Sequence, residues 1–416
     1  MILSNVVFVN FIVAKQIRAK KEAKMIIRDV LRIVPSQNTY MNQIIHRIIS
    51  CTALKNVMNI CDEMVSFDTI KDVYPLKAFR QEIEKGKIAY KTKDINFENT
   101  HYYGIWHTLF GWSKDSIVET PAIEHGLILY NMVCSDTRFT ARAGIATLGK
   151  FRQDIIQKYQ KIPVFTVGPY IHYAESFYST SIIIEEKKKL GKTLVVFPIH
   201  SSPSDKYTIP IKQYCNYLSK LARNFNSVLV CTYWWDLNSP MIDMLSAEGY
   251  RIVSAGFEDD VSFLSRLKSI LSLADFTAGN SIGTHIGYCV YMGKPFLFID
   301  TGYKFQSSRP KRRGYSTDFY NSIEQKIKKV FLDTETVNEH QRAVCNLYWG
   351  LDQIKTREEL EAICQITQSI TRRAKGFTAI YPKVAHKLLY QYQEADPLKY
   401  QLLQDALPTL SHDKKV

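Results

Sequence analysis

Several well-known catalytic signatures are missing from this sequence of 416 residues. It has no G-x-x-x-x-G-K-[ST] phosphate loop and no G-x-G-x-x-G dinucleotide turn. Asp-x-Asp and H-E-x-x-H are also absent, so no recognisable motif would hold a metal ion. These absences argue against a P-loop NTPase and a nicotinamide dehydrogenase. We expect no essential metal and no other essential cofactor.

Paired cysteines and long apolar runs are also missing. None of the eight cysteines forms a C-x-x-C pair, and most lie in apolar runs, which is typical of buried free thiols in a reducing compartment. The apolar stretch from Met1 to Ala14 is shorter than the roughly 20 residues that span a bilayer. Its basic residues follow it, whereas a secretory signal carries them in front.

Met1 to Ala14 is therefore open to two interpretations. It is either the first helix or strand of the fold, or a shallow anchor on a membrane surface. We accordingly expect the protein in the cytoplasm, either free or peripheral on the cytoplasmic face of the inner membrane.

The formal net charge of +14 bears on partners rather than on the fold. It suits phosphorylated substrates, an anionic membrane surface or nucleic acid. The basic residues are spread along the chain, with short clusters at Lys187–Lys189 and Arg309–Arg313. Because zinc-finger spacings and RNA-binding aromatic motifs are absent from the sequence, we do not expect nucleic acid as a partner.

The length is comfortable for two domains, and 46% apolar with 23% charged residues is ordinary for a globular protein. We predict a helical N-terminal region over 1–95, an N-terminal Rossmann-like domain over 96–185 and a C-terminal one over 186–375. A C-terminal helix and tail would fill 376–416. Within the first region, the stretch from Phe79 to Asn99 is rich in charge and predicts a surface connection. The charged run Glu185–Lys189 predicts the interdomain segment.

Residues 192–300 give the clearest pattern. Continuous apolar runs alternate there with helical patterns, which demands a parallel sheet covered on both faces. The fold class predicted is therefore α/β, with a doubly wound sheet in the C-terminal half. The expected strands lie at 193–198, 227–233, 251–255, 276–278 and 295–299, and the expected helices at 212–223, 240–248, 261–274 and 284–292.

Ligands of such sheets bind beyond the carboxyl ends of the strands. After the fourth predicted strand comes Gly279-Asn280-Ser281-Ile282-Gly283-Thr284-His285. Ser281 or Thr284 would cap the next helix, Gly283 would let an anion approach, and His285 would add a donor. This combination predicts a phosphate site. The alternative is an ordinary helix cap, with His285 on the helix surface.

Three other loops follow strands at the same edge. His200, Ser201 and Ser202 are rich in donors, but they also fit a polar turn. Glu258 could accept hydrogen bonds from a ribose, or could be an acidic residue at the start of a helix. The run from Tyr233 to Asp236 offers an aromatic surface for a base or sugar, although core packing explains it equally well.

In the first half, Glu124 and His125 place a carboxylate beside an imidazole, next to Gly126. Together they are candidates for the base that removes a proton from an acceptor hydroxyl. A structural turn explains the pair as well. His172, at the end of a predicted strand, is a second and weaker candidate.

The run Ala274-Asp275-Phe276-Thr277-Ala278-Gly279-Asn280-Ser281, continuing to Gly293-Lys294-Pro295, resembles the donor-site segment of GT-B glycosyltransferases. It is most similar to transferases from bacterial capsule and O-antigen clusters. The "EHG" turn at Glu124-His125-Gly126 and the "HS" turn at His200-Ser201 are similar to turns in those proteins too. The resemblance covers roughly residues 100–385.

The resemblance implies two Rossmann-like domains, the C-terminal one binding the nucleotide of a sugar donor. The N-terminal domain would then bind a glycan or lipid-linked acceptor and supply the base. Retaining members carry a Glu-x7-Glu pair near this loop, and Glu258 has no such partner. That departure favours an inverting mechanism, with helix-terminal donors stabilising the departing phosphate.

Three functions fit these patterns. The first is transfer of a sugar from a nucleotide-sugar co-substrate in surface polysaccharide biosynthesis. The second is a nucleotide-sugar 2-epimerase of the same architecture, which would need no acceptor. The third is a non-catalytic component of a glycan assembly complex. The sequence does not identify the sugar, the nucleotide or the acceptor.

Overall fold

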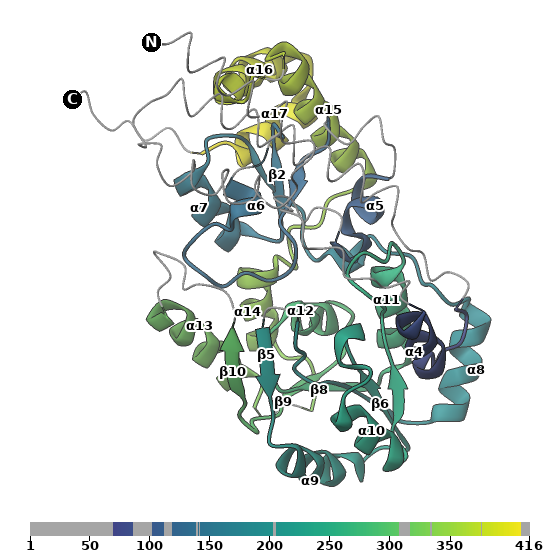
Figure 1. The fold of residues 1–416 in the computed structure, drawn as a ribbon. Coiled ribbons are helices and arrows are strands. Elements are labelled where there is room, and N and C mark those ends of the chain that lie inside the picture. The colour runs from purple at the N-terminus through teal and green to yellow at the C-terminus, as the bar shows by residue number, and fades with distance from the viewer. Residues whose placement is uncertain are drawn as a thin grey trace, which may run out of the picture.

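Two Rossmann-like domains lie one above the other in the computed structural model (Figure 1). The model describes residues 70–85, 102–111, 119–138, 140, 142–202, 205–307, 317–332, 335–375 and 377–408. Most of the helical region predicted over 1–95 lies outside these residues. The described part contains helix α4 (Leu76–Glu84).

Helix α4 belongs to the core of the C-terminal domain. Phe79 is fully buried there, and Arg80 donates two hydrogen bonds to the Leu237 carbonyl, at 3.0 and 2.6 Å. The surface connection predicted from Phe79 onward is therefore wrong for α4, because the helix buries Phe79 and bonds Arg80 against the C-terminal domain.

The N-terminal domain is built on three short parallel strands in the order β1-β2-β3. Their residues are all buried, as expected for strands covered on both faces. The strands are β1 (Ala122–Ile123), β2 (Ile145–Thr147) and β3 (Val164–Thr166). The helical segments here are η2 (Tyr102–Gly104), α5 (Ile105–Phe110), α6 (Ser135–Arg138), α7 (Lys150–Tyr159) and η4 (Tyr170–His172).

The C-terminal domain has a five-stranded parallel sheet in the order β7-β6-β4-β8-β9. The chain starts at β4, moves outward to β6 and β7, then returns to β8 on the other side of β4. This reversal creates a topological switch point between β4 and β8, where ligands of doubly wound sheets bind. The strands are β4 (Thr193–Phe197), β6 (Ser227–Cys231), β7 (Arg251–Val253), β8 (Phe276–Gly279) and β9 (Phe296–Phe298).

The sheet's helices confirm the predicted alternation. They are α9 (Ile211–Ala222), α10 (Pro240–Ala247), α11 (Phe263–Leu273) and α12 (Thr284–Tyr291). Local signals set their ends. Ser239 caps α10 by accepting from Ile242 N, and Pro240 occupies its first turn. The predicted α/β fold with two Rossmann-like domains is confirmed.

An antiparallel ribbon leaves the carboxyl edge of this sheet. It pairs β5 (Asp205–Thr208) with β10 (Lys304–Ser307), so that Phe305 lies opposite Tyr207. Neither segment is among the strands expected from the sequence, because strands of four residues give too short a pattern. Helices α13 (Thr317–Val330) and α14 (Glu339–Trp349) follow the ribbon.

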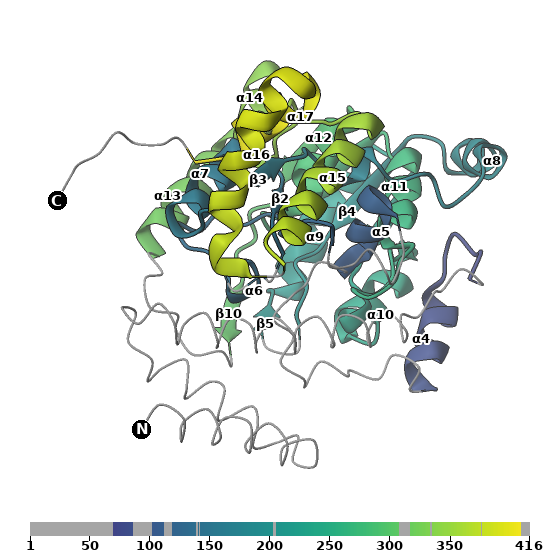
Figure 2. The same ribbon diagram turned by 90° about the horizontal axis from the view of Figure 1, so that it is seen from above.

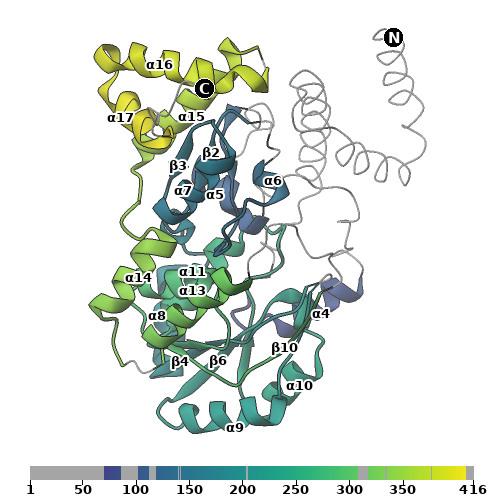
Figure 3. The ribbon, with the colours of Figure 1, turned by 90° about the vertical axis from the view of Figure 1, so that its left-hand side faces the viewer.

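The last helices return to the N-terminal domain. They are α15 (Arg357–Arg373), η6 (Thr378–Ile380), α16 (Tyr381–Ala395) and α17 (Pro397–Ala406), and Figures 1 and 3 show them grouped beside β2 and β3. Gln153 of α7 donates to Asp405 O at 2.8 Å, and Arg372 forms an ion pair with Glu119 at 2.9 Å. A boundary at 375 therefore places α15 in the wrong domain. Its contacts are with the N-terminal one.

The charged run Glu185–Lys189 is helical rather than a linker. It lies in α8 (Thr180–Leu190), which begins at the capping residue Ser179 and leads into β4. Figure 2 shows α8 at the periphery, next to α11. Within the described residues, none of the helices combines the length and the apolar character needed to cross a bilayer.

Candidate functional site

Two loops meet at the switch point, residues 198–202 after β4 and residues 280–283 after β8. Asn280 joins them, since its Oδ1 accepts a hydrogen bond from Ile199 N at 2.6 Å. A backbone N–H can only donate, so this contact fixes the orientation of the amide and directs Nδ2 away from Ile199. Asn280 is 2% exposed, and Nδ2 has no hydrogen-bond partner among the described residues. A buried donor of this kind costs free energy unless a ligand satisfies it.

Helix α12 begins directly after these loops. Its N-cap is Gly283 in extended conformation, and no side chain caps the helix. The prediction that Ser281 or Thr284 caps α12 is therefore wrong. Ser281 stays partly exposed in the loop, and the Thr284 hydroxyl accepts a hydrogen bond from Leu127 N instead. The amides of the first turn keep the positive end of the helix dipole at the switch point, which suits an anion.

His285 faces inward rather than towards the loop surface. Its ring stacks on Phe197 with a centroid distance of 5.0 Å, and it hydrogen-bonds to the Ser281 backbone. Burial, the larger cause, and the nearby His200 together lower the pKa of this imidazole to about 3. His285 is therefore neutral at physiological pH and supports the loop from beneath, whereas the sequence suggested a donor to the ligand.

The "EHG" turn of the N-terminal domain meets the start of α12. Leu127 N donates to Thr284 Oγ1 at 2.9 Å. A Cβ atom on Gly126, whose φ is +70°, would lie 3.1 Å from the same hydroxyl. Two segments selected separately from the sequence, one in each domain, are thus in direct contact. This contact sets the distance between the N-terminal turn and the loop that precedes α12.

Glu124 has structural contacts. Its carboxylate receives Arg152 Nη2 at 2.6 Å and Nε at 2.9 Å, and Thr147 Oγ1 at 2.9 Å. Both charged side chains are essentially inaccessible, at 1% for Glu124 and 0% for Arg152. A carboxylate engaged in this way positions the turn, and we no longer assign it the role of base.

His125, the next residue, is half-buried between aromatic rings. Its ring centroid lies 5.2 Å from that of Tyr102 and 6.4 Å from that of Tyr103. Tyr103 has φ +61°, a left-handed conformation that is uncommon for a residue with a side chain. Such strain persists only where surrounding contacts hold it. Here the Tyr103 N–H donates to Glu258 O at 2.5 Å, which ties the N-terminal segment to the C-terminal domain.

Glu258 contacts both Tyr103 and Tyr233. Its Oε2 accepts a hydrogen bond from the Tyr233 hydroxyl, and the residue is buried. The carboxylate also raises the pKa of Tyr103, although desolvation is the larger cause. Glu258 is not the start of α11, whose N-cap is Ser262. The structure thus places Glu258 at the site, while leaving its predicted contact with a ribose a proposal.

The loop after β4 contains one exposed residue, His200, and two residues with structural contacts, Ser201 and Ser202. His200 is exposed and its ring lies 4.4 Å from that of Tyr233. Ser201 N donates to Asp236 Oδ2 at 2.8 Å, and Ser201 Oγ accepts from Tyr207 N at 3.1 Å. Ser202 exchanges backbone hydrogen bonds with Asp205. Ser201 and Ser202 therefore start the ribbon, and His200 remains the group of this loop that a ligand can reach.

His172 lies away from the switch point, at the opposite end of α12. Its Nδ1 lies 2.5 Å from the Tyr291 hydroxyl, and burial lowers its pKa. This contact joins η4 to the C-terminus of α12 and fits a structural role.

A group of aromatic residues near the switch point was not expected from the sequence. Tyr207 of the ribbon lies 5.5 Å from Tyr303 and 4.9 Å from Phe305, and Tyr130 lies 5.1 Å from Tyr320. They come from the ribbon, from α13 and from the N-terminal loop that begins at His125. Half-exposed rings from both domains suit contact with a sugar acceptor. Of these contacts, the one between Tyr207 and Phe305 could be inferred only from the register of the ribbon.

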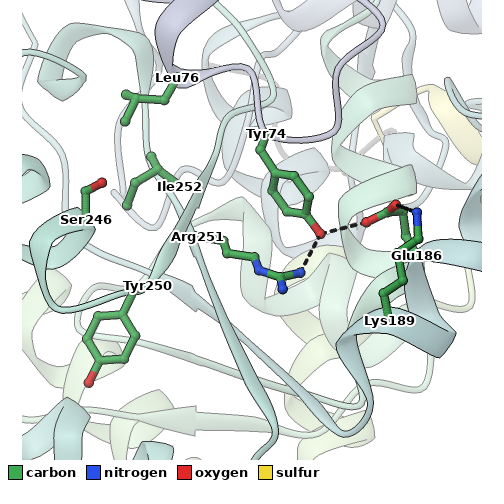
Figure 4. A pocket seen from close by; sticks show the side chains of 8 residues that line it. All are labelled: Tyr74, Leu76, Glu186, Lys189, Ser246, Tyr250, Arg251 and Ile252. Carbon is green, nitrogen blue, oxygen red and sulfur yellow. Dashed lines mark hydrogen bonds and ion pairs between the residues drawn. The ribbon is translucent and has the colours of Figure 1, made fainter.

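A separate pocket of about 560 Å³ lies at the amino end of β7 (Figure 4). Its polar groups bind one another, since Tyr74 OH donates to Glu186 Oε2 at 2.8 Å and accepts from Arg251 Nη1 at 3.1 Å. It lies at the wrong edge of the sheet for the predicted chemistry. Among the described residues, no group of three or more His, Cys, Asp or Glu side chains could hold a metal ion.

The structural likenesses found by comparison with known proteins include the two given below. No family model matches the chain, and no curated protein matches it significantly. The S. aureus MnaA–UDP co-structure matches with a TM-score of 0.32 and 11% identity, over 59% of this chain and 63% of that one. Phytolacca americana UGT2, complexed with UDP-2fluoro-glucose and pterostilbene, matches with a TM-score of 0.23 and 14% identity, over 61% of this chain and 54% of that one. The chain thus spans less than two thirds of either protein, and likeness at this level carries no argument.

Proposed function

We propose that this protein is a glycosyltransferase that binds a nucleotide-sugar at the switch point and passes the sugar to a glycan or lipid-linked acceptor. One observation carries the proposal. The uncapped start of α12 and the buried, unpartnered Nδ2 of Asn280 occur together at the switch point of a doubly wound sheet. Both would be satisfied by the oxygens of a phosphate group.

The donor phosphate would accept hydrogen bonds from the first amides of α12 and from Asn280 Nδ2. Negative charge grows on this phosphate as the sugar leaves, so the positive end of the helix dipole stabilises the transition state. The supporting loop is rigid, because His285 lies beneath it and Asn280 joins it to Ile199. His200 and Glu258 lie on either side of Tyr233 and would contact the nucleoside or the sugar.

His125 is the proposed base. It follows the turn that Leu127 connects to Thr284, so an imidazole of the N-terminal domain is held near the start of α12. A base on this side suits an inverting reaction, in which the deprotonated acceptor hydroxyl attacks the anomeric carbon opposite the phosphate. Glu124 would position His125 indirectly, since Arg152 fixes the turn that precedes it.

Binding is tested by thermal shift and calorimetry with UDP, GDP and CMP. We expect one of them to raise the melting temperature, because a ligand of the folded state stabilises it by mass action. Asn280→Asp keeps an oxygen for Ile199 N and replaces the proposed donor with a second oxygen. We expect at least a tenfold loss of affinity, since a hydrogen bond to a charged group is worth about 1.5–3 kcal/mol.

Asn226→Asp is the matched control. Asn226 Oδ1 accepts from Lys192 N at 2.9 Å, so this asparagine also joins two loops, but at the amino edge of the same sheet. It should leave nucleotide affinity unchanged. Equal losses in both variants would contradict a phosphate contact at Asn280, and no binding of any nucleotide or nucleotide-sugar would reject the proposal.

Product analysis separates transfer from epimerisation. Transfer requires an acceptor and releases the nucleoside phosphate, whereas an epimerase changes the sugar with no acceptor present. We expect His125→Gln to lower the rate of transfer at least a hundredfold with little change in nucleotide affinity. A non-catalytic protein would bind nucleotide without turnover, and His125→Gln would leave cellular glycan unchanged.

A further inference from the structure

The turn between α15 and α16 carries an unusual charge pattern. From Thr371 to Gln393 the chain contains five lysines and arginines and no aspartate or glutamate. These cations are Arg372, Arg373, Lys375, Lys383 and Lys387. We refer to residues 371–390 as the α15–α16 tip.

Large apolar side chains are exposed on this tip. Phe377 is 52% exposed, Ile380 41% and Tyr390 71%. Backbone hydrogen bonds hold the first two in place, from Phe377 N to Ala374 O at 2.9 Å and from Ile380 N to Phe377 O at 3.1 Å. The neighbouring Tyr381 and Ala385 are buried, so the turn is packed on its inner side while its outer side presents Phe377 and Ile380.

The lysines of the tip do not serve the stability of the helix. Lys383 lies in the first turn of α16, where the helix dipole disfavours a cation, and no acidic residue occupies that turn. Lys375, Lys383 and Lys387 are exposed, and none forms an ion pair within the described residues. Arg372, by contrast, is paired with Glu119. The three lysines therefore add uncompensated positive charge beside Phe377 and Ile380.

We propose that the α15–α16 tip docks the protein on the surface of an anionic membrane. Phe377 and Ile380 would enter the boundary between headgroups and acyl chains, and Lys375, Lys383 and Lys387 would contact anionic headgroups. Exposed apolar side chains in the same short segment as three exposed lysines complement such a surface in both charge and polarity. Figure 3 shows α15 and α16 at the end of the molecule away from the C-terminal sheet, so docking there leaves that domain in water.

Vesicle flotation of the full chain tests this inference without any nucleotide or sugar. We expect co-flotation with phosphatidylcholine vesicles containing about 30 mol% phosphatidylglycerol, and much less with phosphatidylcholine alone. Lys383→Gln with Lys387→Gln should weaken binding roughly 25-fold, from about fivefold per basic residue near the surface. Phe377→Ser with Ile380→Ser should weaken it at least tenfold and leave the melting temperature unchanged.

Matched controls distinguish docking by the tip from nonspecific binding through positive charge or exposed apolar side chains elsewhere on the protein. Lys326→Gln with Lys329→Gln removes the same charge from exposed positions on α13, and Leu347→Ser removes a side chain that is 52% exposed on α14. Both controls should bind vesicles as the parent protein does. Absence of vesicle binding would overturn the inference, and so would tip variants that bind like the controls. Because no substrate is used, either result is independent of the proposed transferase activity.

Discussion

The buried ion pair between Glu124 and Arg152 gives the most informative prediction. Glu124→Gln keeps the size of the side chain and removes its charge. Arg152 then remains fully buried with its guanidinium uncompensated. We expect this single change to destabilise the N-terminal domain, because desolvating an unpaired charge costs far more than an exposed ion pair contributes.

The expected magnitude follows from the contacts. Removing one partner of a buried pair costs about 3–5 kcal/mol, and the geometry here is bidentate, at 2.6 and 2.9 Å. Arg152→Met in the same chain removes the orphaned charge. The double variant should therefore recover part of the loss. It should not recover all of it, since Arg152 Nη1 also donates to Tyr130 O at 2.8 Å and holds the loop after His125.

Urea denaturation of the parent, both single variants and the double variant supplies the coupling free energy. Sugar transfer is then measured at a temperature at which every variant is folded. We expect the free energy of unfolding to fall. The rate of sugar transfer should fall as well, because the turn that carries His125 is then misplaced. If Glu124→Gln folded with parental stability and yet abolished transfer, the structural role would be refuted, and Glu124 would return as a catalytic residue.

Two further predictions concern stability. His285 has a pKa lowered to about 3 by burial, so below its ordinary value of 6.5 the unfolded chain takes up a proton that the folded chain does not. Stability should fall as the pH drops from 6.5 towards 3, by about 1.4 kcal/mol per pH unit from this group, and His285→Phe should lose that part of the pH dependence in urea titrations. An unchanged slope in the variant would mean that the imidazole is not held neutral. Gly104→Ala should lower the free energy of unfolding by several kcal/mol, because its Cβ would lie 2.1 Å from Val261 O at φ +65°. At Gly293, φ is +70° and no atom lies within 4 Å of the added Cβ, so Gly293→Ala should show the backbone strain alone, about 1–2 kcal/mol. Equal losses at both glycines would show that the contact between Gly104 and Val261 does not form.

Most of the C-terminal sheet could be predicted because its signals are local. Buried parallel strands are short, continuous apolar runs, and proline, serine and glycine mark the helix ends between them. The loop after β8 could be placed for the same reason, since a small-residue turn between a strand and a helix can be read within a single segment. The short strands β5 and β10 were missed, because alternation over four residues is not distinguishable from loop.

The function of individual site residues could not be predicted in this way. His285 and Glu124 are both polar residues near glycine in candidate loops, and nothing local shows that one faces the core and the other is bound to Arg152. Burial and partners across the chain decide such roles. The same applies to α15, whose amphipathic pattern would fit either domain.

The sequence by itself determined that a small-residue loop follows the fourth strand of a doubly wound sheet and leads into a helix, because strand, loop and helix are contiguous. Only the tertiary structure decided what this loop touches. The bond from Ile199 to Asn280 joins residues 81 apart, and that from Leu127 to Thr284 joins residues 157 apart. Contacts at such separations depend on how the elements pack, and this packing leaves Asn280 Nδ2 buried and unpartnered beside the start of α12.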